Sequence, residues 1–312
     1  MKAAAITQDA ATIPVPRTLS AALLIPALVL ALALVEGCTK SPPPRPSHRG
    51  LEPTQILPGP AGLVSATEPQ PNGTMWLLAG PQGARNLRQL TLSQDQIAAP
   101  VPTNANAAVL SQSSSGVLAI GFATATTGAV ELCSGTTGLS YATIPVAGPV
   151  RSLAFGDDGT TLFVLTGAAN HAEVSVIATS STSLLATLPV PADAVSVVPL
   201  VDESAVYVLG SGGVVSQVAN PGGKVQVQFP AGAGAIAIAL SPDGKSIYVL
   251  KQVGTTSSRN VSVISAVTES TTKVLPAPAY AVAVAVSPSG STLYDVVGNA
   301  RIGNVQAFSL GG

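Results

Sequence analysis

A unit of about 40 residues recurs along the chain from about residue 51 to its last residues. Each copy reads as a short apolar strand, a turn with Gly or Asp, and a second apolar strand that often carries an aromatic residue. The copies are Leu63–Leu77, Ala108–Ile120, Arg151–Val164, Val195–Val208, Ala235–Val249 and Val282–Val296. Their second strands are anchored 41 to 46 residues apart, at Trp76, Leu118, Phe163, Tyr207, Tyr248 and Tyr294. This period, with room for four strands in each unit, is typical of a β-propeller blade.

Turn chemistry and composition support an all-β chain. In Ser241-Pro242-Asp243-Gly244, proline fixes φ, the aspartate bonds locally and glycine accepts a positive φ, as a tight turn requires. Charged residues make up only 9% of the chain, which is too few to cover the solvent-exposed faces of long amphipathic helices. Val and Thr, which favour pleated strands, take their place.

The last repeat ends after Asn304–Ser309 and lacks a fourth strand, while Thr54–Leu57 stands alone before the first repeat. If this segment supplies the missing strand, the ring closes and two open sheet edges disappear. We therefore expect an all-β propeller of about six four-stranded blades over residues 51–312, its closing blade completed by an N-terminal strand. A seven-bladed ring is the alternative, if an irregular stretch hides a blade.

The motif SPDGKSIYV at residues 241–249 resembles the YVTN-type propeller repeat, which also occurs in lactonase-like and surface-layer proteins. The resemblance covers residues 150–310 well and residues 60–145 loosely, and it lacks the Gly-His and Trp-Asp signatures of WD40 blades. It implies an extracytoplasmic location and a binding role, and it fixes no activity. Members of this family are often seven-bladed, which keeps the alternative count open.

The first 37 residues are expected to be a lipoprotein signal peptide. Ala21–Val35 is an uninterrupted apolar run of fifteen residues, short of the roughly 20 that a membrane span needs. Val35-Glu36-Gly37-Cys38 resembles the bacterial lipobox, in which Cys38 would receive the lipid, although Glu36 departs from the usual small residue. Residues 38–50 are a Pro-rich tether. A secreted soluble protein and an uncleaved anchor are the alternatives; all three place the repeats outside the cytoplasm, with lipid anchoring to the membrane of the cell envelope preferred.

Several classes of function are disfavoured by the sequence. A net charge of −1 without a basic stripe argues against a nucleic-acid partner. With Cys38 lipidated, Cys133 remains as a small buried strand residue rather than part of a disulfide framework or zinc site. No Walker loop, H-E-x-x-H motif or G-x-S-x-G elbow occurs, so we expect no cofactor, no metal and no catalytic residue.

The sequence therefore favours a non-catalytic binding or scaffold module, a monomeric propeller that presents loops to a protein or an envelope polymer. His171, in the connection between two strands of one repeat, is the candidate for a binding residue on the rim. The alternative is a lactonase-like hydrolase acting on a small substrate at the mouth of the channel. It would require His171 and several acids to converge in one funnel.

Overall fold

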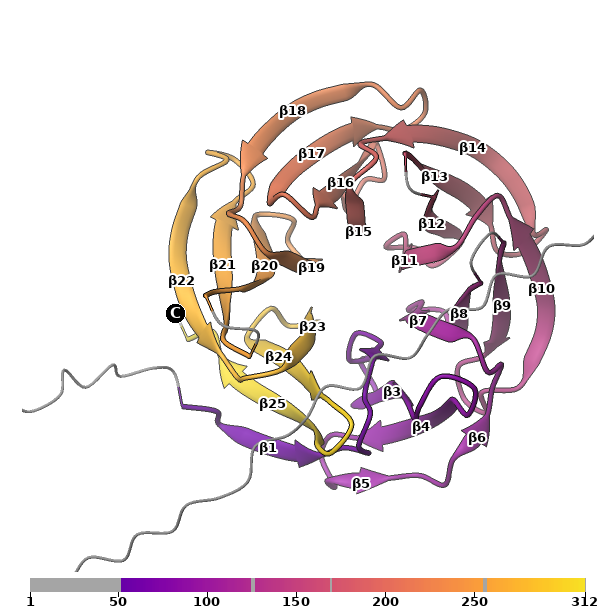
Figure 1. Cartoon of the computed structure of the whole chain (residues 1–312), viewed down its shortest axis with the longest axis vertical. Helices are drawn as coiled ribbons and strands as arrows, with labels where there is room; N and C mark the ends of the chain where they lie inside the picture. Colours follow the sequence, from indigo (N-terminus) through magenta and orange to yellow (C-terminus); the bar gives the residue numbers. More distant parts are fainter. Residues whose placement is uncertain (1–51, 125–126, 169, 255–256, 312) are drawn as a thin grey trace, which may run out of the picture. The chain divides into compact units, whose positions relative to one another are not determined.

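The computed structural model describes residues 52–124, 127–168, 170–254 and 257–311. The segments expected to be a signal peptide and a tether, with Cys38 between them, lie outside the described residues. Within them the chain forms 25 strands, arranged as six antiparallel sheets around a ring (Figure 1). The prediction of six blades is confirmed, and the seven-bladed alternative is wrong because no stretch of the repeats is left over for another sheet.

We number the blades in chain order, each from its innermost strand outward. Blade 1 contains β2 (Ser65–Ala66), β3 (Thr74–Ala79), β4 (Asn86–Thr91), β5 (Gln96–Ile97) and β6 (Val101–Pro102), the last two both pairing with β4. Blade 2 contains β7 (Ala107–Gln112), β8 (Val117–Ala123), β9 (Gly128–Ser134) and β10 (Ser140–Val146). Blade 3 contains β11 (Val150–Phe155), β12 (Thr161–Ala168), β13 (His171–Ala178) and β14 (Ser183–Val190).

The second half of the ring follows the same order. Blade 4 contains β15 (Ala194–Pro199), β16 (Ala205–Gly210), β17 (Val214–Ala219) and β18 (Val225–Pro230). Blade 5 contains β19 (Ala235–Leu240), β20 (Ser246–Gln252), β21 (Arg259–Ser265) and β22 (Thr271–Ala277). Blade 6 contains β23 (Ala281–Val286), β24 (Thr292–Gly298), β25 (Gly303–Ser309) and, as its outermost strand, β1 (Gln55–Pro58).

The first and last described strands pair with each other and close the ring. β1 runs antiparallel to β25, with Leu57 opposite Val305, and the Thr54 N–H donates to the Ala307 carbonyl at 2.8 Å. The predicted exchange of a strand between the two ends of the repeat region is confirmed.

The core is divided among the spaces between blades. Six apolar clusters each join two successive blades, the sixth joining blade 6 to blade 1. In the cluster between blades 3 and 4, Phe163 and Val174 pack with Val197 and Val208. Because both faces of every sheet are covered, the second strands are almost entirely buried, and the rigid ring that results holds its inner strands in place.

The anchor predicted for blade 2 is wrong by one residue. Phe163 pairs with Ala154 of the inner strand, and the residue of blade 2 that pairs in the same way, with Ser111, is Ala119 rather than Leu118. Blade 2 carries a small side chain at this position, where the other five blades carry an aromatic ring, and the neighbouring leucine fits the repeat pattern better than alanine does.

Another repeated feature marks the outer strands. Each carries a proline directly after an inward-facing apolar residue, at Pro58, Pro102, Pro145, Pro189, Pro230 and Pro276. A proline lacks the N–H needed for a ladder, and sheets accept it at an edge whose donor side faces outward. These prolines are 41 to 46 residues apart, so they repeat the period of the blades.

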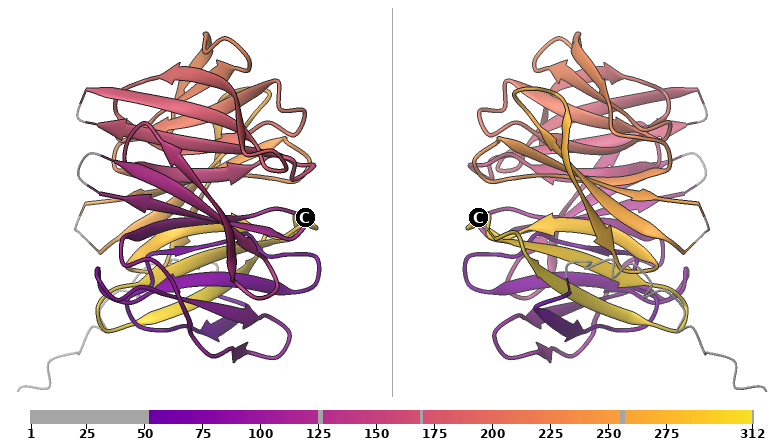
Figure 2. Two further views of the ribbon diagram at one scale, coloured as in Figure 1. Left: turned by 90° about the vertical axis from the view of Figure 1, so that its right-hand side faces the viewer. Right: turned by 90° about the vertical axis from the view of Figure 1, so that its left-hand side faces the viewer.

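The two ends of the strands form two faces, seen edge-on in Figure 2. The turn face holds the loops between the first and second and between the third and fourth strands of each blade; the C-terminus lies there. The link face holds the loops between second and third strands and the connections between blades. On the turn face, Asp158, Asp202 and Asp243 each accept a hydrogen bond from the backbone N–H two residues later, as expected for turn capping.

No helix of the described residues is long and apolar enough to cross a membrane.

Candidate functional site in the central channel

The innermost strands of the six blades surround a cavity of about 410 Å³ along the axis of the ring. This volume lies within the range of small-molecule sites. Three ionisable side chains line it among the described residues, Glu68, Arg151 and Asp157.

The wall of the channel has a polar and an apolar part. Blades 1 to 4 contribute the Ser65, Ser111, Ser152 and Ser196 hydroxyls. Blades 5 and 6 contribute alanine and branched apolar residues along nearly the whole of β19 and β23, including Ile238, Leu240 and Val284. The hydroxyls of blades 1 to 4 are therefore interspersed with apolar residues such as Leu110 and Phe155, whereas the wall from blades 5 and 6 is hydrocarbon apart from Ser241.

Glu68 enters the channel because blade 1 has one extra residue after its inner strand. In blade 3 a single residue separates Ala154, which pairs with β12, from Gly156, whose N–H closes the turn. In blade 1 two residues, Glu68 and Pro69, separate the corresponding bonded N–H groups of Thr67 and Gln70. Such a bulge redirects a side chain at the end of a strand.

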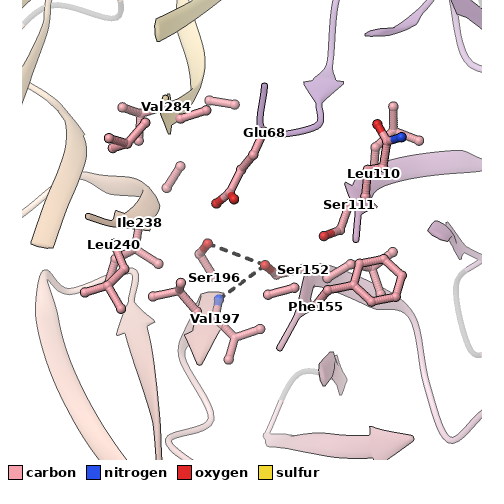
Figure 3. A pocket seen from close by; sticks show the side chains of 18 of the residues that line it. Glu68, Leu110, Ser111, Ser152, Phe155, Ser196, Val197, Ile238, Leu240 and Val284 are labelled. Carbon is pink, nitrogen blue, oxygen red and sulfur yellow. Dashed lines mark hydrogen bonds between the residues drawn. The ribbon is translucent and has the colours of Figure 1, made fainter. Parts of the chain in front are cut away.

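The Glu68 carboxylate points across the channel toward Ser152 and Ser196, as Figure 3 shows. It has no hydrogen-bond or ion-pair partner among the described residues, although its side chain is accessible to water in the channel. The crowding protein wall withdraws bulk solvent from the carboxyl, and this desolvation raises its pKa to about 7. A strongly shifted carboxyl in a cavity is a common mark of a functional site.

Two of the channel serines connect neighbouring blades. Ser152 Oγ accepts a hydrogen bond from the Val197 N–H at 3.2 Å and lies 3.5 Å from Ser196 Oγ. Ser65 Oγ accepts from the Leu110 N–H at 3.0 Å. These bonds fix the hydroxyls in orientation, so that their remaining lone pairs and protons are available to a ligand without loss of side-chain freedom.

Arg151 lies toward the link face, at the opposite end of its strand from the Glu68 side of the channel. Its guanidinium donates to the carbonyls of Ala168, Ala192 and Ala194, at 3.3, 3.2 and 2.8 Å. The cation therefore joins blades 3 and 4 through backbone oxygens and forms no ion pair with Glu68.

Charge is distributed unequally between the two faces. Among the described residues, nine carboxylates belong to the turn face or its mouth of the channel: Glu52, Glu68, Asp95, Asp157, Asp158, Asp202, Glu203, Asp243 and Glu269. Three cations accompany them, Lys224 and Lys245 in the loops and Lys273 near the start of β22. The link face instead carries five cations, Arg85, Arg151, Lys251, Arg259 and Arg301, with Glu173 and Asp193 as its acids. The face onto which the Glu68 end of the channel opens thus carries a net negative charge, and Glu68 and Asp157 lie in the channel itself.

His171, the residue proposed for the rim, begins β13 on the link face. Its ring Nε2 lies 3.3 Å from Glu173 Oε2, and its side chain is 70% exposed. His171 does not line the channel. It lies on the opposite face from the mouth that holds Glu68, so the structure does not gather an imidazole and acids into one funnel. A binding role for His171 on the rim stays a prediction.

Two further predicted features can be placed. Cys133 is buried on β9, as expected of a structural residue; burial, with a smaller effect of the Glu131 charge, raises the pKa of its thiol to about 12. No group of His, Cys, Asp and Glu among the described residues has an arrangement that would hold a metal ion.

Sequence reasoning missed both Glu68 and a second unusual acid, Asp295. The Asp295 side chain is fully buried on β24, and neither carboxylate oxygen has a partner among the described residues. Desolvation raises its pKa to about 7. The signal for Asp295 was present in the repeats, because the residue after the anchor is apolar in the other five blades: Leu77, Ile120, Val164, Val208 and Val249.

Comparisons with known proteins support the fold of the chain and identify neither a family nor an activity. No protein-family model matches the chain, and no curated protein matches its sequence. Among solved structures, hydrazine synthase of Kuenenia stuttgartiensis is similar, with a TM-score of 0.59 and 15% identity over 78% of this chain and 75% of that one. At this identity the likeness supports a shared propeller-like architecture, and the residues of the channel have to be interpreted on their own.

Proposed function

We propose that this chain is a lipid-anchored, monomeric propeller, held outside the cytoplasm, that binds a protein or envelope ligand without acting on it chemically. The observation that carries the binding role is the ligand-sized channel, in which an unpaired carboxylate faces oriented hydroxyls and an apolar wall. Concave sites with a few convergent polar groups are the usual places where proteins bind small molecules.

The surface favours the faces over the outer edges as the place where a larger partner binds. Each outermost strand carries a proline, which weakens pairing with an added strand. The two faces, by contrast, present loops of opposite charge, and complementary charge gives selectivity and speeds encounter. His171 and Glu173 lie on the link face, and Asp157 and Glu269 lie on the turn face, so substitutions at these residues can distinguish the two faces.

Cross-linking of the full chain in its native envelope, followed by recovery of the complex, tests this role. Paired variants, His171→Ala with Glu173→Gln on the link face and Asp157→Asn with Glu269→Gln on the turn face, identify the face. We expect one pair to reduce recovery of a specific partner at least about fivefold while the other pair has little effect. Equal recovery with both pairs, or no specific partner, would contradict a face-directed binding role.

The anchor rests on the lipobox-like Val35-Glu36-Gly37-Cys38 and the Pro-rich segment after it. Cys38→Ser should abolish incorporation of radioactive palmitate, while Cys133→Ser should leave it unchanged because that thiol is buried in blade 2. Continued labelling of the Cys38→Ser protein would remove the lipoprotein part of the proposal. A YVTN-type ancestry remains part of the same proposal, supported by the motif at residues 241–249.

A further inference from the structure

We propose that the channel binds a small organic cation, an ammonium or guanidinium head on a short apolar body, with its head at Glu68 and its body against β19 and β23. The inference deepens the proposed binding function by naming a class of ligand. It rests on the geometry of the cavity, the free carboxylate within it and the charge around its mouth.

The first argument is the unpaired carboxylate. Glu68 projects into the channel without a cation, a backbone N–H or a hydroxyl within bonding distance among the described residues. The carboxylate is exposed to the channel, so a ligand there can reach it without displacing a protein partner. A ligand cation would supply an ion-pair partner, and it would favour the charged form of Glu68, whose pKa the surrounding protein raises by desolvation.

The second argument is the shape and polarity of the wall. Ser152 and Ser196 face Glu68 and offer oxygen acceptors for the other N–H groups of a cationic head. Ile238, Leu240 and Val284 provide a hydrocarbon surface beside the carboxylate. A hydrated metal ion would leave that surface unused, whereas an alkyl group would bury it and gain roughly 25 cal/mol for each Å² removed from water.

The third argument is the field at the entrance. Nine carboxylates and three lysines belong to the turn face and its mouth, so this face attracts cations and repels anions. The other two ionisable groups that line the channel, Asp157 and Arg151, do not oppose this attraction of cations. Asp157 adds negative charge at the same end, and Arg151 is bound to three backbone carbonyls toward the other face.

The test is calorimetric titration of the full chain, purified in a non-ionic detergent, with n-butylammonium chloride at constant ionic strength. n-Butanol and sodium butyrate serve as neutral and anionic probes of similar size, and methylammonium lacks the apolar body. We expect binding at pH 8 in the order butylammonium, then methylammonium, with butanol and butyrate at least about tenfold weaker than butylammonium.

Glu68→Gln keeps the shape of the side chain and removes its charge, and it should weaken butylammonium binding about tenfold or more. Glu52→Gln, the same change at an exposed position before β1, is the matched control and should have no effect. Lowering the pH from 8 to 6 should also weaken binding, because protonation removes the charged form of Glu68 that the cation needs. Thermal unfolding of both variants verifies that the ring is intact.

Three results would overturn the inference: no binding of butylammonium at tens of millimolar, equal binding of butanol or butyrate, or unchanged binding in Glu68→Gln. Failure here is separable from failure of the proposed function, because recovery of a partner by a face does not depend on Glu68. Equal affinity for methylammonium and butylammonium would likewise overturn the part assigned to the apolar wall.

Discussion

The indole N–H of Trp76 on β3 donates a hydrogen bond of 2.8 Å to the carbonyl oxygen of Gly135, in the loop after β9 of the next blade. The tryptophan is 3% exposed and is the single one in the chain. Its ring also packs beside Gly138, where an added Cβ would come within 3.1 Å of the indole. One side chain therefore joins blades 1 and 2 through both apolar contact and a buried polar bond.

Trp76→Phe should destabilise the ring by about 1–3 kcal/mol, because the Gly135 carbonyl loses a buried donor while most of the apolar contact is retained. Urea unfolding followed by circular dichroism measures the change. Tyr141→Phe, which removes an exposed hydroxyl on β10, is the control and should leave the urea midpoint where it is. Equal midpoints for the Trp76 variant and the native protein would show that the hydrogen bond contributes nothing net.

Leu57 and Ile56 provide a second matched pair, on the strand that closes the ring. Leu57 is fully buried in the apolar cluster between blades 6 and 1, whereas Ile56, its neighbour on β1, is 58% exposed. Leu57→Ala should cost about 2–5 kcal/mol of unfolding free energy through lost burial and a residual cavity. Ile56→Ala should change it by less than about 0.5 kcal/mol. Similar losses for both variants, again by urea unfolding, would contradict the pairing of β1 with β25.

Asp295 should make the folded state less stable as pH rises. Its pKa is about 7 in the fold and lies near 3.8 in the unfolded chain, so the folded protein binds the proton more tightly. The contribution of Asp295 to stability is then greatest below about pH 4, falls through the interval up to about pH 7, and above it is lower by on the order of a few kcal/mol.

Asp295→Val introduces the residue found at this position in blades 3, 4 and 5, and it should raise stability at pH 8 and remove this part of the pH dependence. Urea midpoints measured from pH 4 to 8 check both effects. Asp243→Asn is an informative comparison, because the Ser241 hydroxyl and the Lys245 N–H lower the pKa of that exposed carboxyl. Its contribution is therefore lost as pH falls. Parallel pH profiles for native and Asp295→Val proteins would refute the assignment.

Cys133 should be inert in the folded protein. Its side chain is 1% exposed and burial raises its pKa to about 12, so almost no thiolate exists at pH 8. In a Cys38→Ser background, iodoacetamide should leave the native protein unmodified and label one thiol after unfolding in urea. Mass spectrometry reads both states, and rapid labelling before unfolding would mean that blade 2 opens readily.

Most of the architecture could be predicted because every blade repeats the same local pattern. A strand, a capped turn and an aromatic anchor recur at nearly constant spacing, and the missing fourth strand at the end of the repeats pointed to Thr54–Leu57. The error at Leu118 arose where Ala119 replaces the large anchor. Small residues weaken a hydrophobic pattern without changing the register of the strand.

The candidate site was not predicted, for a different physical reason. Glu68 lies in the least regular copy of the repeat, and its direction depends on one added residue in a bulge. Its neighbours in space, Ser152 and Ser196, come from two other blades and are far away in sequence. Convergence of this kind depends on closure of the ring, which no local pattern describes. Asp295 differs, since comparing the six copies position by position would have revealed an acid among apolar residues.

The prolines of the outermost strands bear on how many copies can crowd together. Under the proposed lipid anchoring, the rings would be confined to a surface, where neighbours meet side by side and their outermost strands touch more often than in free solution. Without the prolines, the outermost strands of the six blades would offer six templates for strand addition, which is the first step toward fibrils. With Pro189 and its five equivalents in place, each outermost strand lacks one backbone N–H donor at the equivalent position of its blade. Collisions between neighbouring rings should therefore end in separation, and the population stays available for its ligand.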